Sequence, residues 1–496
     1  MEVSTFALSW TPVLLLTFVA VGLKRPALEL SLIGVGFTAG LAYVGFRTPL
    51  GVIWLAALDG VLTTLPLLLV VLAGILLSNL LRATGGIERI VTWFASGLRH
   101  PEHRHLFISL GTANFLEGAS IIAEPLVAPM LRAAGVSPPG AAALSIIGYA
   151  GLMGVEMAGI IITVLALITG LPPAELASAT AWLSVPATLA MAACIPWYLP
   201  RGEGGLRGLA LMLAGGLLVS LVALAATVTL GVALAGMAGG LALMAALMLL
   251  GARRWQWSRE IRRDLFPFVV ILVPLLLVNT APELRELTSE RLVLHLEVVP
   301  GHRITLTPFF SAYLYLFMAC GTAAAMFGRK VQMAPVLAVS LRQGWRALMG
   351  MALFGAMGQI IAYSGYAQGF GQVDQSRNIP WVLAMGLKTY TGSWYPLFVP
   401  LLGWAGTFLT GYGVASLMLF GELQVRAAGL LQVSAVWLAA GLTVGASVGS
   451  ISSPFKIALA APMCGALGQE GTILRRTIPL GVAASLIIGV ILWAIC

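Results

Sequence analysis

Long apolar runs separated by short polar loops recur along the whole chain. The clearest runs cover residues 5–23, 27–46, 64–81, 308–327 and 347–363. A helix that crosses a bilayer needs about 20 mostly apolar residues, and a helix satisfies its own backbone hydrogen bonds in lipid. The pattern therefore predicts an all-α polytopic membrane protein with about 12–14 transmembrane helices.

Composition supports this fold class. Hydrophobic residues make up 59% of the 496 residues and charged residues only 9%, whereas soluble proteins carry roughly 25% charged residues. The first apolar run has no basic segment before it and no small-residue cleavage site, so we interpret it as a retained span and not as a signal peptide. A plasma-membrane (inner-membrane) location follows for the multi-pass chain.

The basic residues gather in short loops between the runs. This distribution places those loops in the cytoplasm and explains the formal net charge of +9 without a nucleic-acid partner. The segment 281–305 mixes both signs of charge and is expected outside, with a small exposed β-hairpin around Pro300 and Gly301. The four cytoplasmic clusters are Lys24 and Arg25; Arg82, Arg89, Arg99 and Arg104; Arg253, Arg254, Arg259, Arg262 and Arg263; and Arg329, Lys330, Arg342 and Arg346.

Two similar motifs occupy the two halves of the chain. Phe-Leu-Glu-Gly at 115–118 precedes Arg-Ala-Ala-Gly at 132–135, and Phe-Leu-Thr-Gly at 408–411 precedes Arg-Ala-Ala-Gly at 426–429. The first motif is approached from the cytoplasm and the second from outside, which predicts two inverted-topology repeats, as in secondary transporters. We expect one transporter domain over residues 1–496, comprising a first repeat at 27–200, linking spans and a basic cytoplasmic loop at 201–264, and a second repeat at 306–496.

Glycines, prolines and serines interrupt the apolar runs close to ionisable side chains. Such interruptions predict broken or re-entrant helices whose free backbone groups face a site, with Ser453 as a helix cap and Pro454 as the first helical residue. An ionisable group at the bilayer centre costs about 2.5–3.5 kcal/mol, so it is a functional candidate. Desolvation penalises the charged form of a buried Glu, which lets it load and release a proton near neutral pH. We expect proton coupling by Glu117, Glu124 and Glu156, and anion binding by Gly118, Thr410, Gly411, Ser453 and Lys456.

Other polar features have structural interpretations. Glu422 and Arg426 are spaced to form an i,i+4 ion pair, Arg132 is expected to anchor a membrane end, Asp59 to lie near an interface, and Lys388 either to snorkel or to serve the site. The Gly-Ala-Ser-Val-Gly run at 445–449 resembles a hydrolase elbow, but it lies in an apolar helical run without a histidine partner, so helix packing is the preferred interpretation. With no phosphate-binding loop and no cysteine pair at metal or redox spacing, no cofactor or metal is expected.

Several of these segments resemble the L-lactate permease family of bacterial secondary transporters. The matching segments are 86–90, Phe-Leu-Glu-Gly-Ala at 115–119, 400–411, Leu-Phe-Gly with Leu-Gln at 419–424, and Ser453-Pro454. The resemblance implies import of L-lactate, with D-lactate and glycolate as further substrates, coupled to protons. The chain departs from the family pattern at 120–125, at 412–417, and at Phe455 and Lys456.

The sequence thus predicts a secondary active transporter for a small 2-hydroxy monocarboxylate. Its expected partners are the organic anion, protons and the lipid bilayer, with a homo-oligomer as one candidate assembly. A carrier for a different organic anion, such as a sulfonate or dicarboxylate, is the alternative, with Na⁺ coupling through Ser447, Ser450 and Ser452. A membrane-embedded enzyme is disfavoured because no nucleophile–base pair is evident.

Overall fold

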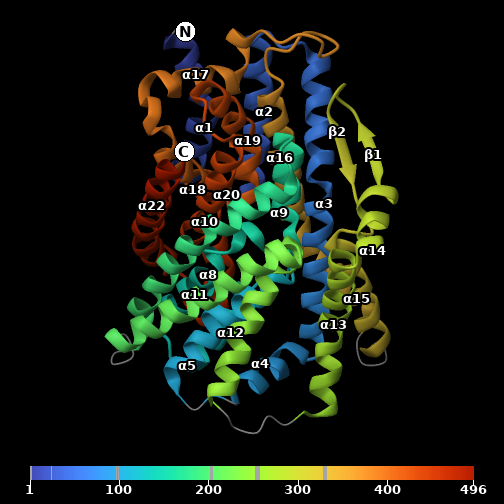
Figure 1. The fold of residues 1–496 in the computed structure, drawn as a ribbon, viewed down its shortest axis with the longest axis vertical. Coiled ribbons are helices and arrows are strands. Elements are labelled where there is room, and N and C mark those ends of the chain that lie inside the picture. Colours follow the sequence, from blue (N-terminus) through green and yellow to red (C-terminus); the bar gives the residue numbers. More distant parts are fainter. Residues whose placement is uncertain are drawn as a thin grey trace.

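The computed structural model describes residues 3–496 except 24, 97, 99, 201–204, 252–256 and 328–331. It is almost entirely helical, with one two-stranded sheet (Figure 1). The predicted all-α class is confirmed. The basic residues Lys24, Arg99, Arg253, Arg254, Arg329 and Lys330, which were assigned to cytoplasmic loops, lie outside the described residues.

Within the described part of the chain, ten helices are long and apolar enough to cross a membrane, or eleven if the bent pair 259–280 and 282–291 counts as one span. The sequence predicted about 12–14 crossings. The difference arises where apolar sequence forms helices too short to span alone, at 157–169, 312–327 and 454–464. A multi-pass membrane protein remains the architecture.

Long helices form one side of the molecule. Helix α3 (Leu50–Ala83) packs along α16 (Met333–Ala362), and α2 (Ala27–Val44) and α15 (Ala312–Phe327) flank this pair. Helix α1 (Val3–Thr17) lies near α2 and α17 (Ile379–Thr391). In Figure 1, α3 runs along almost the full height of the molecule.

Each half of the chain contains a helical hairpin followed by an interrupted helix. In the first half the hairpin joins α5 (Pro101–Leu106), a π-helical turn and α6 (Ala113–Gly118) to α7 (Glu124–Ala133). The interrupted helix consists of α8 (Pro138–Ala150) and α9 (Ile160–Thr169), with two short 3₁₀ turns between them. Helix α10 (Pro173–Cys194) follows.

The second half repeats this order of elements. Its hairpin is α18 (Tyr395–Thr410) and α19 (Gly413–Leu431), and its interrupted helix is α20 (Ala435–Gly449) and α21 (Pro454–Ala460). Helix α22 (Glu470–Ile495) corresponds to α10 in this order. The shared order agrees with two repeats, whereas their inverted orientation across the membrane stays a prediction.

The segment between the halves contains α11 (Leu206–Thr229), α12 (Ala235–Gly251), α13 (Arg259–Thr280) and α14 (Pro282–Glu286), and α4 (Gly86–Ser96) lies beside α3. The predicted β-hairpin is confirmed: β1 (Leu294–Glu297) pairs antiparallel with β2 (Arg303–Leu306). It is exposed only in part, because Ile304 and Leu306 of β2 are buried, and it lies alongside α3 in Figure 1.

Glycines let the helices approach closely around the interruptions. A Cβ on Gly403 of α18 would lie 2.1 Å from the carbonyl oxygen of Leu442, and a Cβ on Gly445 of α20 would lie 2.0 Å from that of Pro400. Small residues allow such close contact between membrane helices. The Gly-Ala-Ser-Val-Gly run therefore serves packing, as the sequence predicted.

The assignment of the basic residues to loops requires correction, because many of them lie in helices. These include Arg82, Arg89, Arg104, Arg259, Arg262 and Arg263. Arg342 and Arg346 lie inside helix α16 and not in a loop, because the helix begins already at Met333. Asp59 is fully buried within α3, and its expected place near a membrane interface stays a prediction. The Glu422–Arg426 ion pair is confirmed, with 2.7 Å between Oε1 and Nη2.

Candidate functional site

A small central cavity lies where the tip of the first hairpin meets elements of the second half. Its volume is about 80 Å³, far below the roughly 300–1,000 Å³ of sites for drug-sized ligands. It therefore suits a ligand of only a few non-hydrogen atoms. Its lining includes Glu117, Ser120, Ile122 and Glu124 from the first hairpin, Met153 and Met157 from the first interruption, and Tyr412, Gly413, Phe455 and Lys456 from the second half.

Lys456 is held by groups from the first half of the chain. Its Nζ atom donates a hydrogen bond of 2.6 Å to the hydroxyl of Tyr149, and that hydroxyl donates one of 2.5 Å to Oε1 of Glu124. Nζ also lies 3.5 Å from the same carboxyl oxygen of Glu124 and 4.7 Å from the centre of the Tyr149 ring. The site thus joins one ammonium and one carboxyl group through a phenol.

The local sequence explains how Lys456 is placed. Ser453 caps α21, because its hydroxyl accepts a hydrogen bond of 3.3 Å from the backbone N–H of Lys456, and Pro454 is the first helical residue. This is the serine-and-proline helix start that the sequence predicted. The cap fixes the first turn of α21 and with it the backbone position of Lys456.

Glu117 lies at the tip of the first hairpin. It is 5% exposed and lines the central cavity, and its Oε1 accepts a hydrogen bond of 2.9 Å from the backbone N–H of Ala123. This bond closes the short loop between α6 and α7. Two carboxyl groups, Glu117 and Glu124, and one cation therefore share the cavity wall.

An ammonium has three N–H donors and no acceptor. Tyr149 takes one of the donors of Lys456, and a small anion in the cavity is a suitable acceptor for another. In a site of low dielectric constant, such a charge pair is worth much more than it is in water. The arrangement can bind a carboxylate and can hold a proton on a neighbouring carboxyl group.

Glu156 occupies a separate position in the first interruption. It is fully buried and, among the described residues, neither of its carboxyl oxygens has a hydrogen-bonding partner. Its side chain lies beside Gly236 of α12. Gly118 packs against the same helix, because a Cβ there would lie 2.3 Å from the backbone nitrogen of Met237.

The predicted residues of the second hairpin lie next to the cavity and not in its wall. The Thr410 hydroxyl donates to the carbonyl of Gly406 at 2.7 Å, and Gly411 has a positive φ of 84° beside Phe455. The following residue, Tyr412, lines the cavity and packs on the Phe455 ring at 4.9 Å. The second hairpin therefore contributes mainly an apolar, aromatic surface to the site, whereas Lys456 comes from α21.

Sequence reasoning missed Tyr149 as a site residue. It is fully buried between Gly148 and the first interruption, and its position beside two glycines was the available signal. It also missed a second buried ionic contact, in which Nδ1 of His302 lies 2.9 Å from Oδ2 of Asp59. His302 and Asp59 lie 243 positions apart in the chain, so no local sequence pattern could predict their contact.

Comparisons with known proteins agree with this architecture. The family model described as L-lactate permease matches residues 5–496. An L-lactate permease from Streptococcus iniae is 23% identical over 428 residues, which cover 82% of this chain and 87% of that protein. The glycolate permease GlcA of Escherichia coli K12 is 40% identical over 101 residues, 20% of this chain and 18% of that protein.

Other matches are more limited. An L-lactate permease from Salmonella typhi is 35% identical over 127 residues, which cover 26% of this chain and only 23% of the relative's length. The solved structure of MtrF from Neisseria gonorrhoeae, titled as one of a class of antimetabolite efflux pumps, aligns with a TM-score of 0.40 at 15% identity, covering 93% of this chain and 83% of that one. A TM-score this low carries no argument about fold or function. The family match over nearly the whole length decides the assignment: the chain belongs to the L-lactate permease family.

Proposed function

We propose that this protein is a secondary active transporter that imports L-lactate, or a similar small 2-hydroxy monocarboxylate such as D-lactate or glycolate, with proton coupling. The observation that carries the proposal is the contact of Lys456 with Tyr149 and Glu124 at a cavity of about 80 Å³. The family match and the names of the relatives, L-lactate permease and glycolate permease, support the choice of substrate.

Lys456 is the proposed partner of the substrate carboxylate. The phenol of Tyr149 positions Lys456 and Glu124 for this contact, because it accepts from one and donates to the other. Tyr412 and Phe455 give the cavity an apolar wall, which suits a methyl group. Gly118, Thr410, Gly411 and Ser453 act through backbone position in this proposal, because they shape the turns that carry the lining residues.

Glu117 is the proposed proton carrier, and Glu124 assists it. Both carboxyl groups line the cavity that holds the ammonium, so binding of an anion changes the charge that each one faces. A proton and a carboxylate then enter together with no net charge. Glu156, buried beside Gly236, is the third member of the proposed set.

Both halves of the chain contribute residues to the lining of this cavity. We infer that residues 27–200 and 306–496 are inverted repeats, because each contains a hairpin and an interrupted helix in the same order. In such carriers the substrate site lies at the repeat interface. One domain over residues 1–496 then carries the complete site.

Uptake into proteoliposomes tests the proposal. The unmodified protein should accumulate lactate when the outside is more acidic, and glycolate should compete. Glu117→Gln should abolish accumulation driven by the pH gradient while lactate–lactate exchange continues. Glu175→Gln, at an exposed position in the first turn of α10, is the control and should behave as the parent does.

Two results would contradict the proposal. Full accumulation by Glu117→Gln would remove Glu117 from proton coupling. Uptake that needs Na⁺ and ignores the pH gradient, or that accepts sulfonates and not lactate, would replace the proposed coupling or substrate.

A further inference from the structure

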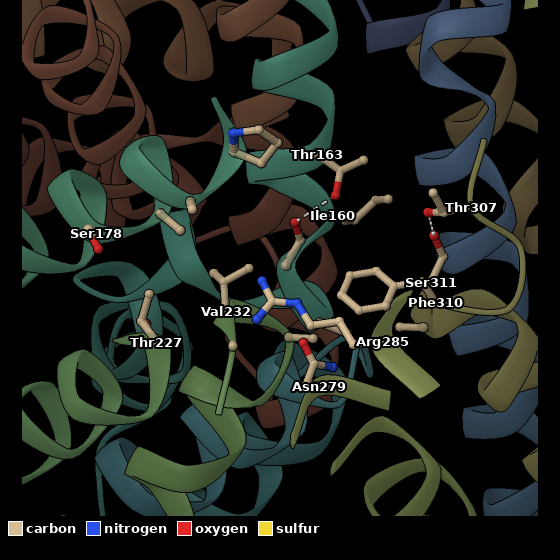
Figure 2. A pocket seen from close by; sticks show the side chains of 18 of the residues that line it. Ile160, Thr163, Ser178, Thr227, Val232, Asn279, Arg285, Thr307, Phe310 and Ser311 are labelled. Carbon is tan, nitrogen blue, oxygen red and sulfur yellow. Dashed lines mark hydrogen bonds between the residues drawn. The ribbon is translucent and has the colours of Figure 1, made fainter. Parts of the chain in front are cut away.

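A second and larger cavity lies on the other side of the first interruption. Its volume is about 260 Å³. The interruption contributes Ala158 and Gly159 to its wall, and the opposite wall comes from Arg285, Phe310 and Ser311. Figure 2 shows the Arg285 side chain extending into the space between Val232 and Phe310. We call this the outer cavity, because residues 281–305 are predicted to lie outside.

The outer cavity carries positive charge. Arg285 is the only residue with a charged side chain among the described residues that line it. Three acidic residues lie close to lining residues in the chain, and none of them lines the cavity: Glu175 of α10, and Glu283 and Glu286 of α14. Glu286 is paired with Arg291, at 2.7 Å between Oε1 and Nη2. A guanidinium cannot lose its proton in a protein, so the cavity keeps this cation at every physiological pH.

Hydroxyl groups and helix ends also surround the outer cavity. The hydroxyls of Thr307 and Ser311 lie 3.1 Å apart and both line the cavity, so they give its wall a polar patch near Arg285. Three helices, α9, α10 and α15, begin at the cavity, and three, α11, α13 and α14, end there. Helix N-termini favour anions and C-termini favour cations, so the helix ends balance and Arg285 provides the main attraction for an anion.

Only a short strained segment separates the two cavities along the chain. Met157 lines the central cavity, and Ala158 and Gly159 line the outer cavity. All three residues have positive φ values, 51°, 51° and 77°. Non-glycine residues adopt this conformation at a cost of about 1–3 kcal/mol each, and such strain concentrates at functional and switching segments.

We propose that the outer cavity is a second binding site for a small carboxylate anion, where the substrate is held by Arg285 before it passes residues 157–159 to reach Lys456. This inference rests on the proposed transport function. It assigns Arg285 a binding role and residues 157–159 the role of a barrier between the two sites.

Thiol labelling in purified protein tests the site without any transport. Ser178 lines the outer cavity, so Ser178→Cys places a thiol there, in a chain that also carries Cys496→Ser to remove the exposed native cysteine. An anionic methanethiosulfonate should react faster than a cationic one, by about tenfold. Millimolar lactate should slow the anionic reagent, and chloride at the same concentration should slow it less.

Arg285→Gln should remove both the preference for the anionic reagent and the protection by lactate, whereas Arg285→Lys should keep much of both. The native Cys496, labelled in the chain without Ser178→Cys, is the control and should not respond to Arg285→Gln. The proposal is overturned if Ser178→Cys does not react, if Arg285→Gln leaves the preference unchanged, or if chloride protects as well as lactate. Protection without uptake would contradict the proposed transport function alone, and uptake without protection would contradict the outer site alone.

Discussion

Lys456 donates a hydrogen bond of 2.6 Å to the hydroxyl of Tyr149, although the two residues lie 307 positions apart in the chain. The same hydroxyl donates to Glu124 at 2.5 Å. Tyr149 therefore lies between the ammonium group from the second half and a carboxyl group from the first half. A phenol between an ammonium and a carboxyl group can accept from one and donate to the other. Together with the direct contact of Lys456 and Glu124 at 3.5 Å, the hydrogen bond from Lys456 to Tyr149 joins the two halves of the protein at the site.

Tyr149→Phe should weaken substrate binding and leave the protein folded. The change removes the hydroxyl and keeps the fully buried ring in place. Loss of a hydrogen bond between buried groups costs about 1–3 kcal/mol, which corresponds to about a 5- to 150-fold weaker affinity. Lactate binding by isothermal titration to purified protein measures the effect.

Tyr395→Phe provides a matched control for that variant. Tyr395 is also fully buried, and its hydroxyl bonds to Gln424 at 3.0 Å, away from the cavity lining. It should lower stability by a comparable amount without a similar loss of affinity. Equal losses of affinity in the two variants would show that Tyr149 acts only through packing.

The Lys456–Glu124 contact should show strong coupling in a double-mutant cycle. Removing one member of a buried ion pair leaves an uncompensated charge, at a cost of about 3–5 kcal/mol, whereas removing both costs far less. Lys456→Met and Glu124→Gln should therefore each lower the thermal unfolding temperature in detergent. The double variant should recover most of that loss while remaining inactive in uptake. Additive losses in the double variant would show that the two side chains do not interact.

The sequence was sufficient to predict those parts of the site that depend on local pattern. The cap formed by Ser453, the first-turn Pro454 and the i,i+4 pair of Glu422 and Arg426 follow from residue spacing within one turn of helix. Lys456 and Glu124 were identified one by one, because a charge in apolar sequence is conspicuous. Their contact with each other was not predicted.

The other contacts of the site, and the full lengths of the long helices, depend on tertiary packing and cannot be predicted from local sequence patterns. Tyr149 was overlooked because an aromatic residue in an apolar run has the ordinary signature of a core residue. The contact of Asp59 with His302 was not predicted, because the two residues lie 243 positions apart. The helices α3 and α16 were predicted only in part, as the apolar runs 64–81 and 347–363, since polar residues before these runs, such as Arg346, resemble loop residues when burial is unknown.

Two glycines from the repeated motifs should respond in opposite ways to alanine. A Cβ on Gly118 would lie 2.3 Å from the backbone nitrogen of Met237, whereas nothing lies within 4 Å of a Cβ on Gly429. Gly118→Ala should therefore force α6 and α12 apart, which costs about 1–3 kcal/mol as other overpacked sites do. Gly429→Ala in helix α19 should be neutral or stabilising by about 0.5–1 kcal/mol.

Thermal unfolding of the two purified variants measures this difference. Uptake should fall with Gly118→Ala, because the hairpin tip that carries Glu117 shifts with it, and should persist with Gly429→Ala. Normal stability of Gly118→Ala would show that α6 and α12 are less tightly packed than the structure indicates.

The stabilising effect of His302 should depend on pH. Nε2 of its ring lies 2.9 Å from the carbonyl oxygen of Leu167, and Nδ1 lies 3.0 Å from Oδ1 of Asp59. Both neighbours are acceptors, so the doubly protonated imidazolium fits this position. Burial lowers the pKa of His302. The hydrogen bonds to Asp59 and Leu167 and the charges of Asp59 and Glu422 raise this pKa by more than burial lowers it, so the net shift is upward.

The direction of that shift fixes the pH window. A histidine whose pKa is higher in the folded state stabilises the protein most below its unfolded pKa of about 6.5, and this contribution is lost as the pH rises through the folded value. His302→Gln should therefore lower the unfolding temperature most at acidic pH and least at alkaline pH. His295→Gln, at an exposed position in the same β-hairpin, should show no such trend. Since His302 ties the hairpin to α3 and α9, an equal loss at every pH would mean that its contribution comes from packing and not from its charge.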